Sequence, residues 1–251
     1  MRIKVLGTRG EVEPSSPYHA KHSGVLVDGE VLFDLGEREF LDLNPRVVFI
    51  THLHPDHAFF VNEPAEVSVP LYGPEAFGKN PAVDIRVLEG AVDFDTYRVT
   101  PIPTHHSLRV KSQAYLLQKG EERILYTGDM VWIDKRYHPL LNGLDLVVTE
   151  GSFDRRGGRV NRDAKTGKVY GHTGVPNLVR LFREFTGNIL ITHFGTWFYE
   201  DPRGAVRKLK ELGRENGVNV IAGYDGLELD LVKEMGSPPV VTWPMPECPY
   251  L

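Results

Sequence analysis

The sequence has little of three features that would place it in a special class of protein. Its one cysteine, Cys248, allows no disulfide within the chain, so a reducing, cytoplasmic setting is expected. No apolar run approaches membrane-spanning length, and the first ten residues form a strand pattern rather than a signal peptide, so we expect no membrane association. The net charge of −5 gives no overall attraction to nucleic acid, although a local basic patch is not excluded.

The composition is that of an ordinary globular protein with a sizeable core. Hydrophobic residues make up 41% of the 251 residues and charged residues 25%. There is no long linker, repeat or low-complexity segment. We therefore predict a single domain over residues 1–251, which ends in an extended, proline-rich tail from about residue 236.

The pattern along the chain changes near residue 150, from short strands to a mixture of helices and strands. Apolar runs between turn residues predict strands at 3–7, 24–28, 30–36, 47–51, 68–73, 82–89, 97–103, 112–118, 123–129 and 144–150. A loop is expected at 151–171, helices at 175–185 and 201–217, a strand at 188–195, and a hairpin at 219–232 that turns at Asp225-Gly226. Two packed sheets covered by helices fit this order.

A dense group of ligand-type residues follows the apolar run at 47–51. The segment THLHPDH places His52, His54, Asp56 and His57 within six positions. In a tight loop this spacing can point side chains in two directions, so His52 with His54 and Asp56 with His57 can form separate ligand sets. Imidazole and carboxylate suit zinc, iron or manganese.

Further ligand-type residues stand at the carboxyl ends of later apolar strands. They are His105 or His106 after YRVTPIPT, Asp129 at the end of RILYTGD, and His193 in NILITHFG. Alone, each would be read as a loop residue, but together they predict a metal site at one edge of a sheet.

With these residues in this order, the sequence resembles the metallo-β-lactamase superfamily, most of all its ribonuclease Z and phosphodiesterase branch. The resemblance runs from GTRG at 7–10 and LFDLG at 32–36 to HFG at 193–195, and it depends on the HxHxDH motif. It implies an α/β (α+β) fold of the αββα sandwich type, with two packed mixed sheets flanked by helices.

The resemblance also implies a ligand set for two divalent ions, Zn²⁺ first, with Mn²⁺ or Fe²⁺ as alternatives. One ion would be held by His52, His54 and His106, the second by Asp56, His57 and His193, and Asp129 would bridge them. His106 is preferred to His105 because His106-Ser107, followed by Ala114-Tyr115, matches the family pattern. Asp34 would lie behind the ligands and orient the metal-binding loop.

Two shorter segments resemble ribonuclease Z in particular. TEGSF at 149–153 and GHTGVPNL at 171–178 imply that Glu150 orients His172, which would support the scissile phosphate or protonate the leaving group. Only 23 positions separate His106 from Asp129, so the family's long RNA-gripping arm has no room there. The short basic segment 155–168 could contact phosphates, or it could be a flexible charged loop.

The expected activity is therefore metal-dependent phosphodiester hydrolysis by a water that bridges two metals, with Asp56, Glu150 and His172 as the catalytic residues. RNA and cyclic or small nucleotides are the candidate substrates, and a homodimer is compatible with the sequence. The alternatives are a lactone, thioester or β-lactam hydrolase with the same metal centre, and a non-catalytic, metal-stabilised binding module.

Overall fold

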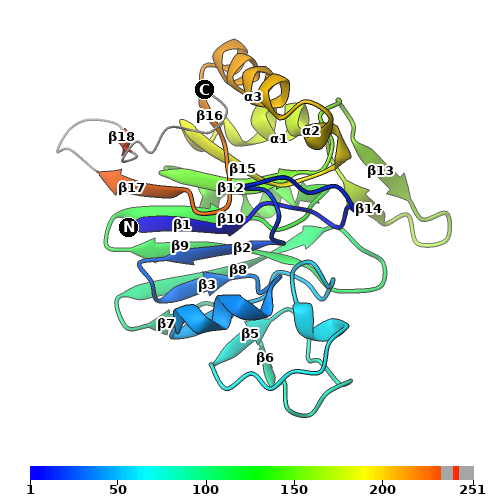
Figure 1. The fold of residues 1–251 in the computed structure, drawn as a ribbon, viewed down its shortest axis with the longest axis vertical. Coiled ribbons are helices and arrows are strands. Elements are labelled where there is room, and N and C mark those ends of the chain that lie inside the picture. Colours follow the sequence, from blue (N-terminus) through cyan, green and yellow to red (C-terminus); the bar gives the residue numbers. More distant parts are fainter. Residues whose placement is uncertain (233–239, 243–251) are drawn as a thin grey trace.

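The computed structural model describes residues 1–232 and 240–242, and its arrangement is shown in Figure 1. Most of the predicted tail, together with Cys248, lies outside these described residues.

The first sheet is built around the parallel strands that lead into the HxHxDH loop. In spatial order it contains β18 (Val240–Thr242), β17 (Glu228–Val232), β1 (Arg2–Gly7), β2 (Gly24–Val27), β3 (Val31–Phe33), β4 (Val47–Phe49), β5 (Leu71–Gly73) and β6 (Ile85–Val87). Strands β3 to β6 are parallel, and β4 is buried on both faces, as its continuous apolar run predicted. β2 and β3 form the hairpin expected at Asp28-Gly29, where both residues have positive φ.

The second sheet is also mixed. Its order is β11 (Trp132–Ile133), β8 (Tyr97–His105), β9 (Gln113–Lys119), β10 (Glu122–Tyr126), β12 (Leu146–Gly151), β15 (Asn188–Phe194) and β16 (Asn219–Ala222), with β7 (Val92–Phe94) paired to β8. Strands β10, β12, β15 and β16 are parallel.

The two sheets pack face to face, with helices on the outer faces, so the predicted sandwich is confirmed (Figure 1). Side chains of both sheets form the central core. A second apolar cluster joins the outer face of the second sheet to α1 (Val175–Phe182), α2 (Thr196–Glu200), α3 (Pro202–Asn216) and the 3₁₀ helix η3 (Lys135–Leu141). The outer face of the first sheet is covered by 3₁₀ helices, η1 (Arg38–Leu43) and η2 (Phe59–Val61), and by adjoining loops.

Both ends of α3 match the signals in the sequence. Asp201 caps the first turn by accepting from the backbone N–H of Gly204, Pro202 begins the helix, and Gly217 ends it at φ 70°.

Two expectations were wrong. Residues 219–232 do not form a hairpin, because β16 pairs with β15 in the second sheet and β17 pairs with β1 in the first. The connection between them crosses from one sheet to the other. The predicted loop at 151–171 contains most of an antiparallel hairpin, β13 (Arg159–Arg162) and β14 (Val169–His172).

No helix among the described residues is long and apolar enough to cross a membrane.

Candidate metal centre

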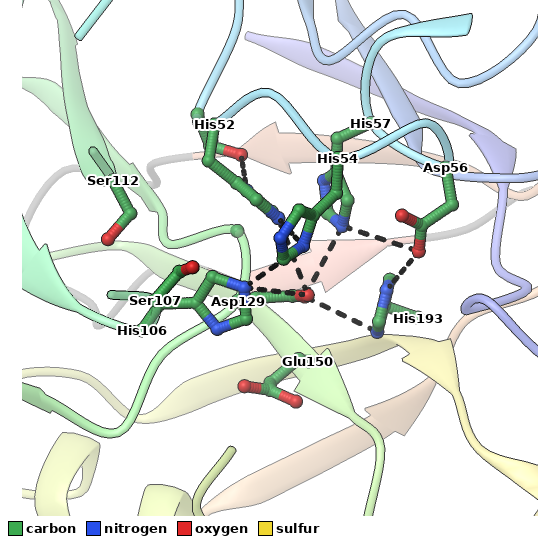
Figure 2. Close-up of polar contacts among 12 residues, drawn as sticks. His52, His54, Asp56, His57, His106, Ser107, Ser112, Asp129, Glu150 and His193 are labelled. Carbon is green, nitrogen blue, oxygen red and sulfur yellow. Dashed lines mark hydrogen bonds and ion pairs between the residues drawn. The ribbon is translucent and has the colours of Figure 1, made fainter. Parts of the chain in front are cut away.

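The predicted ligand residues converge at one edge of the sandwich. The loop after β4 carries His52 to His57, and in the other sheet His106, Asp129 and His193 lie at or just beyond the carboxyl ends of β8, β10 and β15. Figure 2 shows their side chains pointing to a common centre around Asp129. Because the carboxyl ends of these strands meet at the same edge, residues far apart in sequence become neighbours.

Three histidines form the first group. The Nδ1 atom of His54 lies 3.1 Å from Nε2 of His52 and 3.2 Å from Nε2 of His106. His106 must carry its proton on Nδ1, because that atom donates to the carbonyl oxygen of Gly171 at 3.0 Å. Its Nε2 lone pair therefore faces the other two rings.

The ring of His52 is fixed through Thr51 and Asp34. The Thr51 hydroxyl donates to the Asp34 carboxylate, so its oxygen accepts from Nδ1–H of His52 at 3.0 Å. This leaves Nε2 of His52 unprotonated and turned toward the centre. Asp34 holds the same loop through the backbone N–H of Thr51, at 2.7 Å.

Asp56, His57 and His193 form the second group. Nδ1–H of His57 donates to Asp34 at 2.6 Å, which leaves its Nε2 facing Oδ1 of Asp129 at 3.3 Å. Nε2 of His193 lies 2.9 Å from Oδ2 of Asp56. These pairings join each histidine of the group to a carboxylate.

Asp129 lies between the two groups, and each of its carboxylate oxygens faces one of them. Oδ2 lies 3.7 Å from Nε2 of His52 and 3.8 Å from Nε2 of His106, whereas Oδ1 lies 3.3 Å from Nε2 of His57 and 3.3 Å from Nδ1 of His193. The carboxylate can therefore interact with both groups at once.

A third group, which contains Glu150 and His172, borders the first two. Nδ1–H of His172 donates to Oε2 of Glu150 at 2.8 Å, and the other Glu150 oxygen accepts from the backbone N–H of Met130 at 2.7 Å. His172 is 23% exposed, whereas Glu150 is buried. A histidine at the rim is thus held by a buried carboxylate.

Ser152 connects this pair to the second group, and sequence reasoning missed it. Its hydroxyl donates to Glu150 and lies 3.1 Å from Nδ1 of His193, from which its oxygen accepts. This contact orients the His193 ring, whose Nε2 lies 2.9 Å from Oδ2 of Asp56. The signal was present in TEGSF, two positions after Glu150, but only the glutamate was assigned a role.

His105 lies outside the centre. It is 38% exposed and pairs with Asp134 at 2.9 Å, whereas His106 is buried among the ligand candidates. The choice of His106 over its neighbour agrees with this placement.

The electrostatics of the two groups differ. Burial lowers the pKa of His52, His54 and His106, so the first group is a set of neutral imidazoles. Burial also opposes protonation of His57, but the carboxylates of Asp129, Asp34 and Asp56 outweigh it and raise its pKa well above the usual value. The pKa of Asp129 falls well below its usual value despite burial, because His193 and His57 favour its charged form.

The donor set fits divalent metal. Nε2 of His57 and Oδ1 of Asp129 are buried and adjacent, and neither has a hydrogen-bond partner among the residues that the structure describes, as expected of two atoms that share a cation. Ligand nitrogens of a tetrahedral zinc site, with bonds of about 2.0–2.1 Å, stand about 3.3–3.4 Å apart. The spacings of 3.1 and 3.2 Å in the first group are close to this.

The backbone is strained at two site residues. Asp34 and His193 have φ of 58° and 51°, which is uncommon for residues other than glycine and accumulates at functional sites. Gly128, just before Asp129, has φ 57°, and a Cβ there would lie 2.5 Å from the Thr51 hydroxyl. A side chain at this position would displace the aspartate from the loop it contacts.

Solved structures with this fold include several metallo-β-lactamase-type proteins. The fold protein YhfI of Bacillus subtilis is 17% identical with a TM-score of 0.67, and the match covers 90% of this chain and 98% of that one. A diphosphatase of the PhnP family is 18% identical with a TM-score of 0.62, covering 91% and 97%. The short form of human tRNase Z is 18% identical with a TM-score of 0.58, covering 93% and 100%. Comparison with curated protein sequences gave no match.

These similarities define the fold as that of the metallo-β-lactamases, as the sequence predicted. The family model for the β-lactamase superfamily domain matches residues 38–194, which contain all the ligand candidates. The chain belongs to this superfamily of metal-dependent hydrolases.

Proposed function

We propose that this protein is a phosphodiesterase that uses two divalent metal ions. The observation that carries the proposal is the position of Asp129, with one oxygen toward each histidine group, beside the His172–Glu150 pair. The diphosphatase and the tRNase Z among the structural neighbours add support, since one name refers to a diphosphate substrate and the other to an RNA substrate, both of which contain phosphate linkages.

In this proposal each group holds one ion. His52, His54 and His106 would hold the first, Asp56, His57 and His193 would hold the second, and Asp129 would be a ligand shared by both. Imidazole and carboxylate donors favour Zn²⁺, with Mn²⁺ and Fe²⁺ as the other candidates. When bound, the ions polarise the phosphoryl oxygen and lower the pKa of an attacking water.

Asp56 orients the attacking water and takes its proton. Its Oδ2 is paired with Nε2 of His193 at 2.9 Å. Burial opposes ionisation of Asp56, but His57 and His193 outweigh it and hold its pKa below the usual range, so the carboxylate is charged at neutral pH.

His172 acts on the leaving oxygen. Burial disfavours its charged form, but the carboxylates of Glu150 and Asp129 outweigh burial and raise its pKa to about 9. Once Asp129 binds cations its contribution diminishes, and Glu150 remains as the partner that keeps the imidazolium protonated. An imidazolium at the rim can protonate the alkoxide that departs from a phosphodiester.

The test is hydrolysis of bis(p-nitrophenyl) phosphate by protein stripped with a chelator and then loaded with Zn²⁺, Mn²⁺ or Fe²⁺. We expect turnover only after loading. Loaded protein that cleaves no phosphodiester but opens a lactone, a thioester or a β-lactam would replace this proposal with the corresponding hydrolase. Loaded protein inactive on the whole panel would favour a binding module.

A further inference from the structure

Hairpin β13–β14 is an unusual feature for a chain of net charge −5, because it is strongly basic. Residues 155–172 carry six exposed basic side chains and one acid, Asp163; the basic ones are Arg155, Arg156, Arg159, Arg162, Lys165 and Lys168. None of the six forms an ion pair with a residue that the structure describes. In Figure 1 the hairpin projects from the side of the sandwich.

The hairpin is attached directly to the metal centre. The backbone N–H of Gly171 donates to the carbonyl of His106 at 2.6 Å, and Nδ1–H of His106 donates back to the carbonyl of Gly171. The next residue, His172, is the last of β14 and belongs to the centre itself. The position of the hairpin is therefore coupled to that of a ligand candidate.

The strand register gives the two faces of the hairpin different roles. Arg159 lies directly opposite His172 in the antiparallel pair, and residues opposite one another project from the same face. Arg162 stands three positions along β13 and so projects from the other face. There its guanidinium donates to the carbonyl of Gly167 at 2.7 Å, within the turn of the hairpin.

From this register we propose that Arg159 binds a second phosphate of the substrate, on the leaving-group side of the scissile bond. This inference rests on the proposed function, in which His172 protonates the leaving oxygen. A cation beside His172 then faces the departing part of the substrate, and the other exposed basic residues of the hairpin add to the positive potential around it. The substrate class that fits is a single-stranded oligonucleotide rather than a cyclic or small nucleotide.

The test compares two matched variants, Arg159→Gln and Arg162→Gln. Each removes one positive charge from the same hairpin, and glutamine at 162 keeps an amide donor for the Gly167 carbonyl. Binding of short fluorescein-labelled single-stranded RNA and DNA is measured by anisotropy with metal-loaded protein at several salt concentrations. Thermal melting checks that both variants are folded.

Arg159→Gln should weaken binding about tenfold and reduce the slope of log Kd against log salt by about one, as for the loss of one phosphate contact. Arg162→Gln should change Kd less than about twofold. Equal losses of affinity in both variants would overturn the claim that only the face with Arg159 meets the substrate. Unchanged binding in Arg159→Gln would overturn the proposed contact between Arg159 and a phosphate. Hydrolysis of bis(p-nitrophenyl) phosphate by the wild-type protein tests the proposed function separately, because the binding results do not depend on turnover.

Discussion

The carboxylate of Asp34 accepts a 2.6 Å hydrogen bond from Nδ1–H of His57, and this bond fixes which nitrogen of His57 faces the metal centre. Asp34 also holds the loop through Thr51 and accepts from the hydroxyl of Tyr126 at 2.9 Å. It is fully buried and lies at the carboxyl end of β3, next to the strand that leads into the ligand loop.

The Asp34 network predicts a graded loss of metal affinity. Asp34→Ala should weaken metal binding about 10–100-fold, the usual cost of losing a group that orients a ligand. Tyr126→Phe removes a single hydrogen bond to the same carboxylate and should cost less. Metal retained during dialysis against a series of chelator concentrations measures both. Wild-type retention in Asp34→Ala would contradict the orienting role.

Ser152 should have a similar but more local effect. Its oxygen accepts from Nδ1–H of His193, so Ser152→Ala frees that ring and should lower occupancy of the second metal while the first stays bound. Metal content after partial chelation is the measurement. Equal loss of both ions would indicate general disruption of the centre.

His172 should be needed for turnover but not for metal. His172→Ala should retain its metal and lose about 10²–10⁴-fold in kcat, the usual range for general acid–base catalysis. The loss should be smallest for nitrophenolate, a leaving group that needs little protonation, and larger for alkoxide leaving groups. His105→Ala is the matched control, since His105 pairs with Asp134 outside the centre, and both its metal content and its turnover should stay normal. Metal loss in His172→Ala would make that residue a ligand.

Stability should fall on mild acidification because of His19. Burial lowers its pKa from 6.5 to about 4, and its ring packs against Phe194 and Phe198. The folded state therefore binds fewer protons than the unfolded state between these values, so stability is lost as pH falls from about 6.5 toward 4. This shift in the pKa of His19 corresponds to roughly 3 kcal/mol in the free energy of unfolding.

His19→Asn isolates this effect, since its amide can still donate to the oxygen of Thr8, which accepts from Nδ1–H of the histidine. Urea unfolding between pH 4 and 7 measures how the free energy of unfolding depends on pH. The slope should be shallower for the variant, by an amount that corresponds to the uptake of up to one proton on unfolding. Identical slopes would show that His19 does not titrate in this way.

Much of the site could be predicted from local patterns. The apolar run at 47–51 followed by THLHPDH specifies a buried strand with ligands at its end, and the later strand ends supply partners because parallel strands share an edge. The role of Ser152 could not be predicted, because it depends on Glu150 and His193, which approach only when β12 and β15 pair. The crossing between β16 and β17 was missed for a similar reason, since Asp225-Gly226 has the residues of a hairpin turn while long-range pairing decides the partner strands.

Hairpin β13–β14 was read as a loop because β13 is exposed and mostly polar and β14 is only half-buried, so neither shows the apolar alternation of a packed strand. Its pairing is stabilised by the backbone ladder and by the contact between Gly171 and His106, neither of which leaves a pattern in sequence.

The central claim is that Asp129 joins two metal sites in one centre, and metal stoichiometry tests it most directly. Chelator-stripped protein is titrated with Zn²⁺ and the bound metal is measured by mass spectrometry of the intact protein, for the wild type and for Asp129→Asn. We predict two ions per chain in the wild type and weakened binding of both in the variant, because each histidine group faces one oxygen of this carboxylate. Saturation of the wild type at one ion, or a variant that loses only one, would contradict the account.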